Sequence, residues 1–346
     1  MTRGVAFQFN LPTRVRFGEG ELQALPGEAT ALGMTRPLLV TDATLVQTPH
    51  LQRTVADCLT AGLALETWDG VVPNPTDTSV HEGLALFRSS GCDSLISYGG
   101  GSAIDSAKAI GVLASSGGDN ILDHVLPDPS PIAPLPPLIA VPTTAGTGSE
   151  VTWVSIVTSS VTGRKAVIRN PALYPAVSIV DPVLTHSMPP GLTVNTGFDA
   201  FSHSVETYTS GMRAPVSDPL AYRSMGMIVA ALPRAVRDGA DAEARYQMSM
   251  AATMAGIAFT NGGLHSGHHM SHVLTSRYHL AHGLACILTI PALLAYLRPV
   301  CMEKVASLAP LFGASPDLPP ENAAVWAAVE LRALMDAVGV PSIEEA

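Results

Sequence analysis

The first part of this 346-residue chain alternates short apolar runs with amphipathic segments, and this alternation constrains the fold more than any other feature. Apolar strands that alternate with helices are typical of a parallel sheet covered by helices on both faces. We expect strands at residues 36–42, 65–68, 94–98 and 138–141, and helices near residues 49–62, 79–90 and 103–114. The pattern predicts an α/β unit with a doubly wound parallel sheet.

The pattern changes after Asp181-Pro182, where strand-like runs disappear and helical periodicity dominates. We expect helices at residues 193–209, 219–232, 242–258 and 323–338. A chain of this length exceeds one ordinary domain. We therefore place a domain boundary near Leu184, with an α/β domain at residues 1–184 and an all-helical domain at residues 185–346.

The composition excludes several classes of partner. Charged residues make up only 14% of the chain, and the formal net charge is −10 with no basic run. We therefore expect neither nucleic acid nor an anionic membrane surface as a partner. No run approaches the ~18–20 consecutive apolar residues of a membrane span, and residues 1–7 lack the apolar core of a signal peptide. These features predict a cytoplasmic protein.

Six of the eleven histidines lie in the segment His265–His282. Within it, His268 and His272 are four residues apart, a spacing that places both on one face of a helix. Upstream, Asp199 and His203 have the same spacing. Any single histidine here is most simply a packed structural residue, but burying many imidazoles without partners is costly. The two pairs therefore indicate a site for a divalent metal with nitrogen and oxygen ligands.

The four cysteines are scattered, without a CxxC pair or any other metal-binding spacing: Cys58, Cys92, Cys286 and Cys301. Reduced, buried thiols are the simplest interpretation, and they suit a cytoplasmic protein. Cys286 follows His282 by four residues and could approach the same site, but we interpret it as a packing residue.

Two small-residue loops each follow an expected strand. Gly99-Gly-Gly-Ser102 precedes a helix, whose free N–H groups and positive dipole end can bind a phosphate. Pro142–Glu150 offers hydroxyls and backbone amides to a ribose or a phosphate. Both loops would lie at the carboxyl ends of strands, where ligands bind in open α/β sheets. Either loop alone could be an ordinary turn, whereas the pair predicts a nucleotide site.

Four charged residues accompany these loops. Asp42 ends a strand, where a carboxylate can bind ribose hydroxyls and repel a 2′-phosphate; a helix-capping aspartate is an equally good interpretation. Asp105 and Lys108 open the helix after the glycines and could pair with each other. Lys165 is either a turn lysine or a cation of the site.

Taken together, these segments resemble the iron-containing (group III) alcohol dehydrogenase family, which includes lactaldehyde and propanediol reductases. The resemblance runs from Phe17-Gly-Glu-Gly20 to Leu294. It includes Val40-Thr-Asp42, Asp69-Gly-Val-Val-Pro-Asn-Pro75, Gly99-Gly-Gly-Ser-Ala-Ile-Asp105, Pro142-Thr-Thr-Ala-Gly-Thr-Gly-Ser-Glu150, Asp181-Pro182, Thr196-Gly-Phe-Asp-Ala-Phe-Ser-His203 and Ala281-His-Gly283.

The resemblance implies a metal-dependent alcohol dehydrogenase or aldehyde reductase that transfers a hydride between a nicotinamide dinucleotide and a small alcohol or aldehyde. It implies that a divalent ion, Fe²⁺ first and Zn²⁺ second, binds to Asp199, His203, His268 and His282. The same resemblance gives His272 a proton-relay role. Family members are often homodimers, and we expect the helical metal-binding domain to be shorter at its C-terminus than in many of them.

For the cofactor, the resemblance implies NAD, with NADP the less favoured choice because of Asp42. The pyrophosphate is assigned to the glycine-rich loop, and the nicotinamide and adenine to the second loop. The candidate cofactor-binding residues are Asp42, Gly99, Gly100, Gly101, Ser102, Asp105, Thr143, Thr144, Thr147, Ser149 and Lys165.

Three alternatives remain at this point. A maleylacetate-reductase-like enzyme would act without a metal, but Asp199 speaks against it. A dehydroquinate-synthase-like lyase would need more basic residues in the second domain to hold an acidic substrate. A silent metal- or nucleotide-binding protein would bind NAD without turnover. Serine and cysteine hydrolases are disfavoured because no GxSxG segment is present and no cysteine has a suitable local context.

Overall fold

A computed structural model describes residues 6–126, 128–212, 214–278, 280–343 and 345. The chain divides into two compact units. Leu11–Thr144 and Ser149–Thr185 form the α/β unit, and the helical unit is formed by Ala145–Gly148 and His186–Ala346 together with Met1–Asn10. Over the described residues, no helix is both long enough and apolar enough to span a bilayer.

The α/β unit is built on a six-stranded parallel sheet, which confirms the predicted fold class. Its strands are β1 (Arg14–Phe17), β2 (Pro37–Val40), β3 (Glu66–Trp68), β4 (Ser94–Gly99), β5 (Leu138–Pro142) and β8 (Val177–Val180). Their order across the sheet is β1-β8-β5-β4-β2-β3. A separate antiparallel pair joins β6 (Val154–Thr158) to β7 (Lys165–Arg169).

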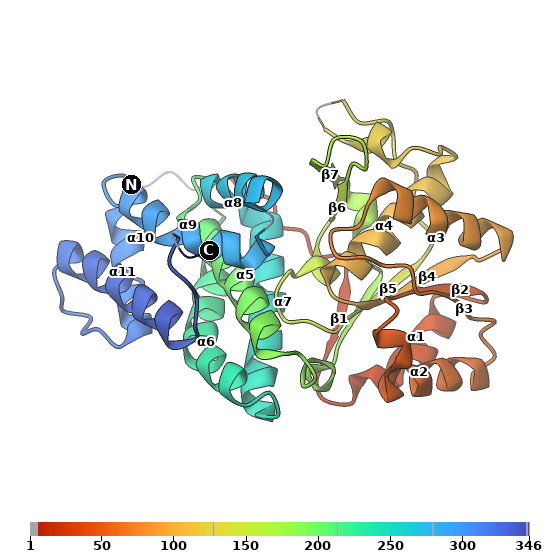
Figure 1. Ribbon diagram of the computed structural model, residues 1–346, viewed down its shortest axis with the longest axis horizontal. Helices are drawn as coiled ribbons and strands as arrows, with labels where there is room; N and C mark the ends of the chain where they lie inside the picture. The colour runs from red at the N-terminus through yellow and green to blue at the C-terminus, as the bar shows by residue number, and fades with distance from the viewer. Residues whose placement is uncertain (1–5, 127, 213, 279, 344, 346) are drawn as a thin grey trace. The chain divides into compact units, whose positions relative to one another are not determined.

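Helices cover both faces of the sheet (Figure 1). One layer contains α1 (Leu25–Ala31) and α2 (Pro49–Thr60), and the other contains α3 (Asp77–Ser89) and α4 (Gly101–Ser116). Successive strand residues point to opposite faces. Leu38 therefore joins the core under α3 and α4, whereas the next residue, Leu39, joins the core under α1 and α2. Burial on both faces explains why these strands are continuous apolar runs.

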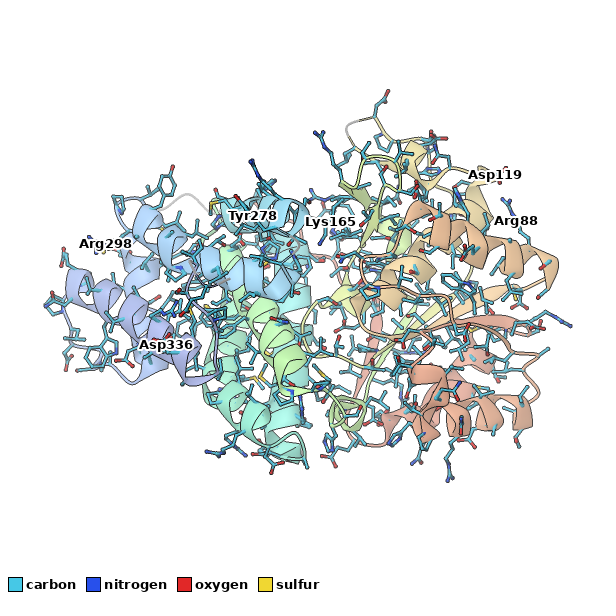
Figure 2. All side chains as sticks on the ribbon, in the orientation of Figure 1. Arg88, Asp119, Lys165, Tyr278, Arg298 and Asp336 are labelled. Carbon is cyan, nitrogen blue, oxygen red and sulfur yellow. The ribbon has the colours of Figure 1, made fainter. Side chains whose placement is uncertain are left out.

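Local signals fix the helix ends of this unit. Thr76 and Ser79 form a reciprocal capping box at the start of α3. At the other end of α3, Arg88 pairs with Asp119 through Nη1 and Oδ1 at 2.7 Å (Figure 2). The guanidinium also donates to the carbonyl of Leu113, so it joins the C-terminal ends of α3 and α4.

The helical unit contains α5 (Pro190–Thr209), α6 (Ser217–Arg237), α7 (Ala242–Gly262), α8 (Ser266–Tyr278), α9 (His282–Leu297), α10 (Met302–Ala306) and α11 (Pro320–Ala337). Helix α5 packs against α6, α7 and α9. Its Phe198, Phe201 and Val205 are fully buried in the main core of the unit. Short 3-10 helices complete the described chain: Glu21–Ala24, Leu45–Gln47, Ile121–His124, Ser149–Val151, Pro171–Leu173, Pro182–Thr185 and Ala309–Phe312.

Candidate metal centre and nucleotide loops

The two predicted nucleotide loops meet at the carboxyl ends of the adjacent parallel strands β4 and β5. Gly100 is the N-terminal cap of α4 and provides no side chain to cap it. A Cβ at Gly100 would lie only 3.2 Å from the side chain of Thr144, and Thr143 N donates to Gly99 O at 3.0 Å. The first amides of α4 and the second loop therefore lie side by side, an arrangement suited to a phosphate.

Asp105 and Lys108 organise the segment that follows the second loop. The Lys108 ammonium is fully buried and donates to the carbonyls of Ser149, Thr152 and Val154 at 2.7, 2.9 and 2.8 Å. Asp105 Oδ1 accepts a hydrogen bond from Ser149 Oγ at 2.7 Å. Burial lowers the pKa of Lys108 to about 8, although Asp105 opposes the shift. Both side chains thus fix the backbone around Ser149.

Three further cofactor candidates have different surroundings. Asp42 Oδ1 accepts from the backbone amides of Thr44 and Leu45, both at 2.9 Å, as a turn-capping aspartate does. Lys165 is the first residue of β7 (Figure 2). Thr147 belongs to the short segment Ala145–Gly148, which groups with the helical unit.

The four predicted metal ligands converge in the helical unit. Asp199 and His203 lie one turn apart on α5, His268 lies on α8, and His282 begins α9. Asp199 Oδ1 is 3.8 Å from His203 Nε2, 3.8 Å from His268 Nε2 and 3.7 Å from His282 Nε2. Three helices thus bring three imidazole nitrogens around one buried carboxylate oxygen.

A tighter group of four possible ligand atoms lies within 4.8 Å of one another, and its members are Asp199, His268, His282 and Cys286. Cys286 was expected to be a packing residue, whereas its sulfur lies among the candidate ligand atoms. His203 flanks this group: its ring stacks on those of His268 and Phe259, with centroids 4.6 and 4.5 Å apart.

Glu206, which was not among the predicted site residues, holds His268 in place. Its side chain is fully buried, and Oε1 lies 2.5 Å from His268 Nδ1 while Oε2 accepts from His265 N at 2.8 Å. His268 Nδ1 faces Glu206, and Nε2 faces the Asp199 carboxylate at 3.8 Å. Burial lowers the pKa of His268, but Cys286, Asp199 and Glu206 raise it well above its usual range. Nε2 and the carboxylate that face each other require a proton or a cation between them. This carboxylate–histidine arrangement is typical of metal sites.

Two glycines permit these close approaches. A Cβ at Gly283 would lie 1.8 Å from the carbonyl oxygen of Asn195, so only glycine lets α9 begin against α5 with His282 in this place. A Cβ at Gly267 would lie 2.5 Å from Glu206 Oε1. The close contact at Gly283 therefore helps to position His282, and the one at Gly267 helps to position His268.

The electrostatics of the cluster suit a cation. Burial alone would raise the pKa of Asp199, but His203, His268 and His282 reverse the shift and hold it well below its usual range. Burial lowers the pKa of His203 to about 4, against the opposing effect of Asp199. His203 is therefore neutral at neutral pH and keeps a nitrogen lone pair, while Asp199 is ionised. This donor set fits a divalent first-row metal ion.

The other histidines of residues 265–282 are not among the four predicted metal ligands. His272 is partly exposed, and its ring centroid lies 5.4 Å from that of His282. His265 Nε2 pairs with Thr209 Oγ1 at 3.0 Å, and the exposed His269 contacts the carbonyl of His265 at 2.8 Å. His279 lies outside the described residues.

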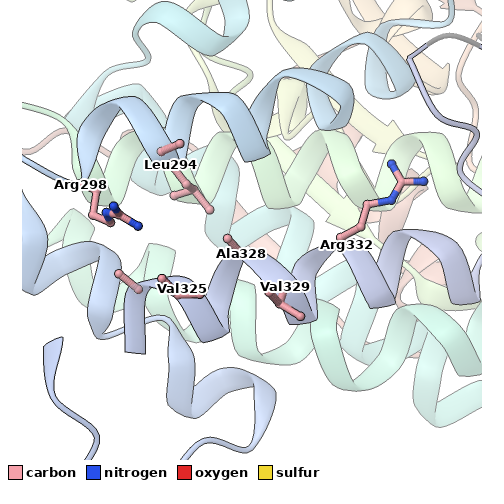
Figure 3. A pocket seen from close by; sticks show the side chains of 8 residues that line it. Leu294, Arg298, Val325, Ala328, Val329 and Arg332 are labelled. Atoms are coloured by element: carbon pink, nitrogen blue, oxygen red, sulfur yellow. The ribbon is translucent and has the colours of Figure 1, made fainter. Parts of the chain in front are cut away.

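The helical unit also has an apolar groove of about 300 Å³ between α9 and α11 (Figure 3). None of the candidate ligands lines it. Its lining residues are Leu294, Ala295, Arg298, Ala324, Val325, Ala328, Val329 and Arg332.

Comparison with known proteins matches both parts of the chain to one family. A family model described as iron-containing alcohol dehydrogenase matches residues 12–182, and a model for the C-terminal part of the Fe-containing alcohol dehydrogenase family matches residues 193–343. The chain belongs to the iron-containing alcohol dehydrogenase family. This membership confirms the predicted resemblance.

Named relatives of this iron-containing alcohol dehydrogenase family member cover nearly its whole length. An NAD-dependent methanol dehydrogenase of Bacillus methanolicus is 38% identical over 96% of this chain and 87% of the relative. A 1,3-propanediol dehydrogenase of Klebsiella pneumoniae is 37% identical over 97% and 87%. The solved structure of an alcohol dehydrogenase from Oenococcus oeni is 35% identical, with a TM-score of 0.94 over 98% of this chain and 89% of that one.

Proposed function

We propose that this protein is a metal-dependent alcohol dehydrogenase and aldehyde reductase that transfers a hydride between NAD and a small alcohol or aldehyde. One observation carries the proposal: three imidazole Nε2 atoms lie 3.7–3.8 Å from the buried Asp199 Oδ1. Family membership and relatives that act on methanol and 1,3-propanediol give this cluster its chemical context.

Four side chains would hold the ion, and they are Asp199, His203, His268 and His282. A divalent ion bound there supplies Lewis acidity toward the oxygen of the substrate. His203 already has the neutral form that ligation needs, since burial lowers its pKa to about 4. Glu206 orients His268 through the 2.5 Å contact with Nδ1. His272, which is partly exposed beside His282, would carry the substrate's proton to solvent.

The α/β unit would bind the cofactor, whose nicotinamide ring carries the hydride. The amides of Gly101 and Ser102 at the start of α4 would bind the pyrophosphate, and Asp42 would disfavour a 2′-phosphate. The other proposed contacts are Gly99, Gly100, Asp105, Thr143, Thr144, Thr147, Ser149 and Lys165. We place the boundary of this dinucleotide-binding domain at residue 184 and assign the metal to residues 185–346.

The family description names iron, so Fe²⁺ is the first ion to test, and Zn²⁺ is the second. We also propose that the protein is a cytoplasmic homodimer, which light scattering of the purified protein would test. Its four free cysteines support a reducing compartment.

The decisive experiment is a panel of short aldehydes with NADH and NADPH, run on protein of known metal content. We expect NADH-linked reduction that chelation abolishes and that added ion restores. His268→Ala should abolish it, whereas His269→Ala, which removes an exposed neighbour on the same helix, should not. Full activity after chelation would contradict the metal role and favour a metal-independent reductase. Tight NADH binding without turnover of any aldehyde would contradict the enzyme itself.

A further inference from the structure

We propose that Cys286 supplies a sulfur donor to the ion held by Asp199 and the histidines, and that this sulfur shifts the preference of the site toward thiophilic ions such as Zn²⁺ and Co²⁺. This inference rests on the proposed metal site, but it concerns Cys286, and it is tested by metal preference and the spectrum of the bound ion rather than by activity.

The position of the sulfur supports this role. Cys286 lies one turn after His282 on α9 and is only 1% exposed. Its Sγ lies 3.8 Å from Asp199 Oδ1, 3.8 Å from His268 Nε2 and 3.8 Å from His282 Nε2. Donors bound ~2.0–2.3 Å from one tetrahedral ion lie ~3.4–3.6 Å apart. The observed spacings exceed this by only a few tenths of an ångström.

Hydrogen bonding alone does not account for the arrangement. A thiol has one proton and is a weak donor, yet three donor or acceptor atoms face this sulfur at equal distance. His268 Nδ1 contacts Glu206, so Nε2 is the ring nitrogen that faces the sulfur and Asp199 Oδ1 and that would bind an ion there. A cation bound among these atoms satisfies all of them, which one S–H cannot do.

The other cysteines of the chain have different surroundings. Cys301 Sγ contacts the carbonyl of Leu297 at 3.5 Å, as a packed helical cysteine does. Cys58 and Cys92 belong to the α/β unit. Over the described residues, Cys286 is the cysteine that joins a group of possible metal ligands.

The chemical consequence is a change in metal preference. Carboxylate and imidazole ligands bind many divalent first-row ions, whereas a thiolate favours softer ones. A site made only of Asp199 and histidines serves as the reference. Relative to it, the sulfur of Cys286 should raise the affinity for Zn²⁺ and Co²⁺ more than the affinity for Fe²⁺ and Mn²⁺.

The electronic spectrum of Co²⁺-loaded protein tests this directly. A sulfur ligand gives an intense near-ultraviolet sulfur-to-cobalt charge-transfer band, whatever the activity of the protein. We expect this band in the wild type and in Cys301→Ser, the control on the same unit. We expect Cys286→Ser to bind Co²⁺ without the band. In competition experiments, the ratio of its affinity for Zn²⁺ to its affinity for Mn²⁺ should fall about tenfold.

The outcomes separate the two proposals. Wild-type protein that binds Co²⁺ without the band would overturn the sulfur role and leave the proposed function intact. A band that persists in Cys286→Ser would overturn it as well. Wild-type protein that binds no divalent ion would overturn both. If Cys286→Ser fails to fold by circular dichroism, Cys286→Ala and the wild-type spectrum decide the question.

Discussion

Replacement of Glu206 by glutamine tests whether the site depends on a positioned His268. Glutamine keeps the shape of the side chain but removes the negative charge that faces His268 Nδ1 at 2.5 Å. Glu206 is fully buried, so water cannot replace the lost interaction. Loss of such a partner typically weakens metal binding by ~10–100-fold, which is about 1.4–2.7 kcal/mol.

The loss of metal affinity in Glu206→Gln can be measured as the stabilisation that metal gives in thermal or denaturant unfolding. An ion at ~100 times its wild-type Kd stabilises the folded protein by about 2.7 kcal/mol. If Glu206→Gln weakens binding by ~10–100-fold, the same ion concentration stabilises the variant by only about 0.4–1.4 kcal/mol. Competition with a chromophoric chelator gives the affinity independently.

Glu150→Gln is the matched control, because Glu150 is also a buried glutamate but belongs to the α/β unit. It should leave the metal affinity unchanged even if it lowers stability. Wild-type metal affinity in Glu206→Gln would refute the reasoning, since the contact to His268 would then have no role in presenting its Nε2.

Three further predictions concern cofactor choice and stability. Asp42→Ala should raise kcat/KM with NADPH relative to NADH, because it removes a carboxylate that would face a 2′-phosphate; an unchanged ratio of steady-state rates would contradict this. Phe198→Ala should lower the free energy of unfolding by about 3–5 kcal/mol in urea titration, since Phe198 is 0% exposed and packs edge-on to Phe201. The pKa of Lys108 is lowered from 10.5 to about 8 in the folded chain. Between these pH values the unfolded chain binds more protons, so the Lys108 contribution to stability rises with pH and is lost as the pH falls toward 8. The difference in unfolding free energy between wild type and Lys108→Met should therefore change by about 3 kcal/mol between pH 8 and 10.5. A difference that stays constant over this pH range would contradict the lowered pKa of Lys108.

The parallel sheet was predictable because its central strands are continuous apolar runs that alternate with helices. The predicted strand at 94–98 and β4 (Ser94–Gly99) differ by one residue. The strand β1 was missed because it has four residues, three of them only partly buried, and its partner β8 lies some 160 residues away in the chain. The β6–β7 pair was missed because it lies outside the main parallel sheet, where the alternation of strands and helices is no guide.

The candidate site was predictable where its geometry is local. The spacing of Asp199 and His203 fixes both on one face of α5, whatever packs around them. Glu206 lies seven residues after Asp199 on the same helix, and this spacing was the signal that could have revealed it. The spacing of His282 and Cys286 likewise places both on one face of α9. How α9 packs against α5 at Gly283 is a tertiary contact that this spacing does not encode, and it decides whether the sulfur reaches the site.

The central claim is that one divalent ion held at Asp199 enables NAD-linked alcohol oxidation. The most direct test is to strip the metal, titrate the protein with Fe²⁺ or Zn²⁺, and follow NAD reduction with a short alcohol alongside the bound metal. The account predicts a rate that rises in proportion to bound ion and saturates at about one ion per chain, and no recovery in Asp199→Ala. A full rate in metal-stripped protein would contradict it.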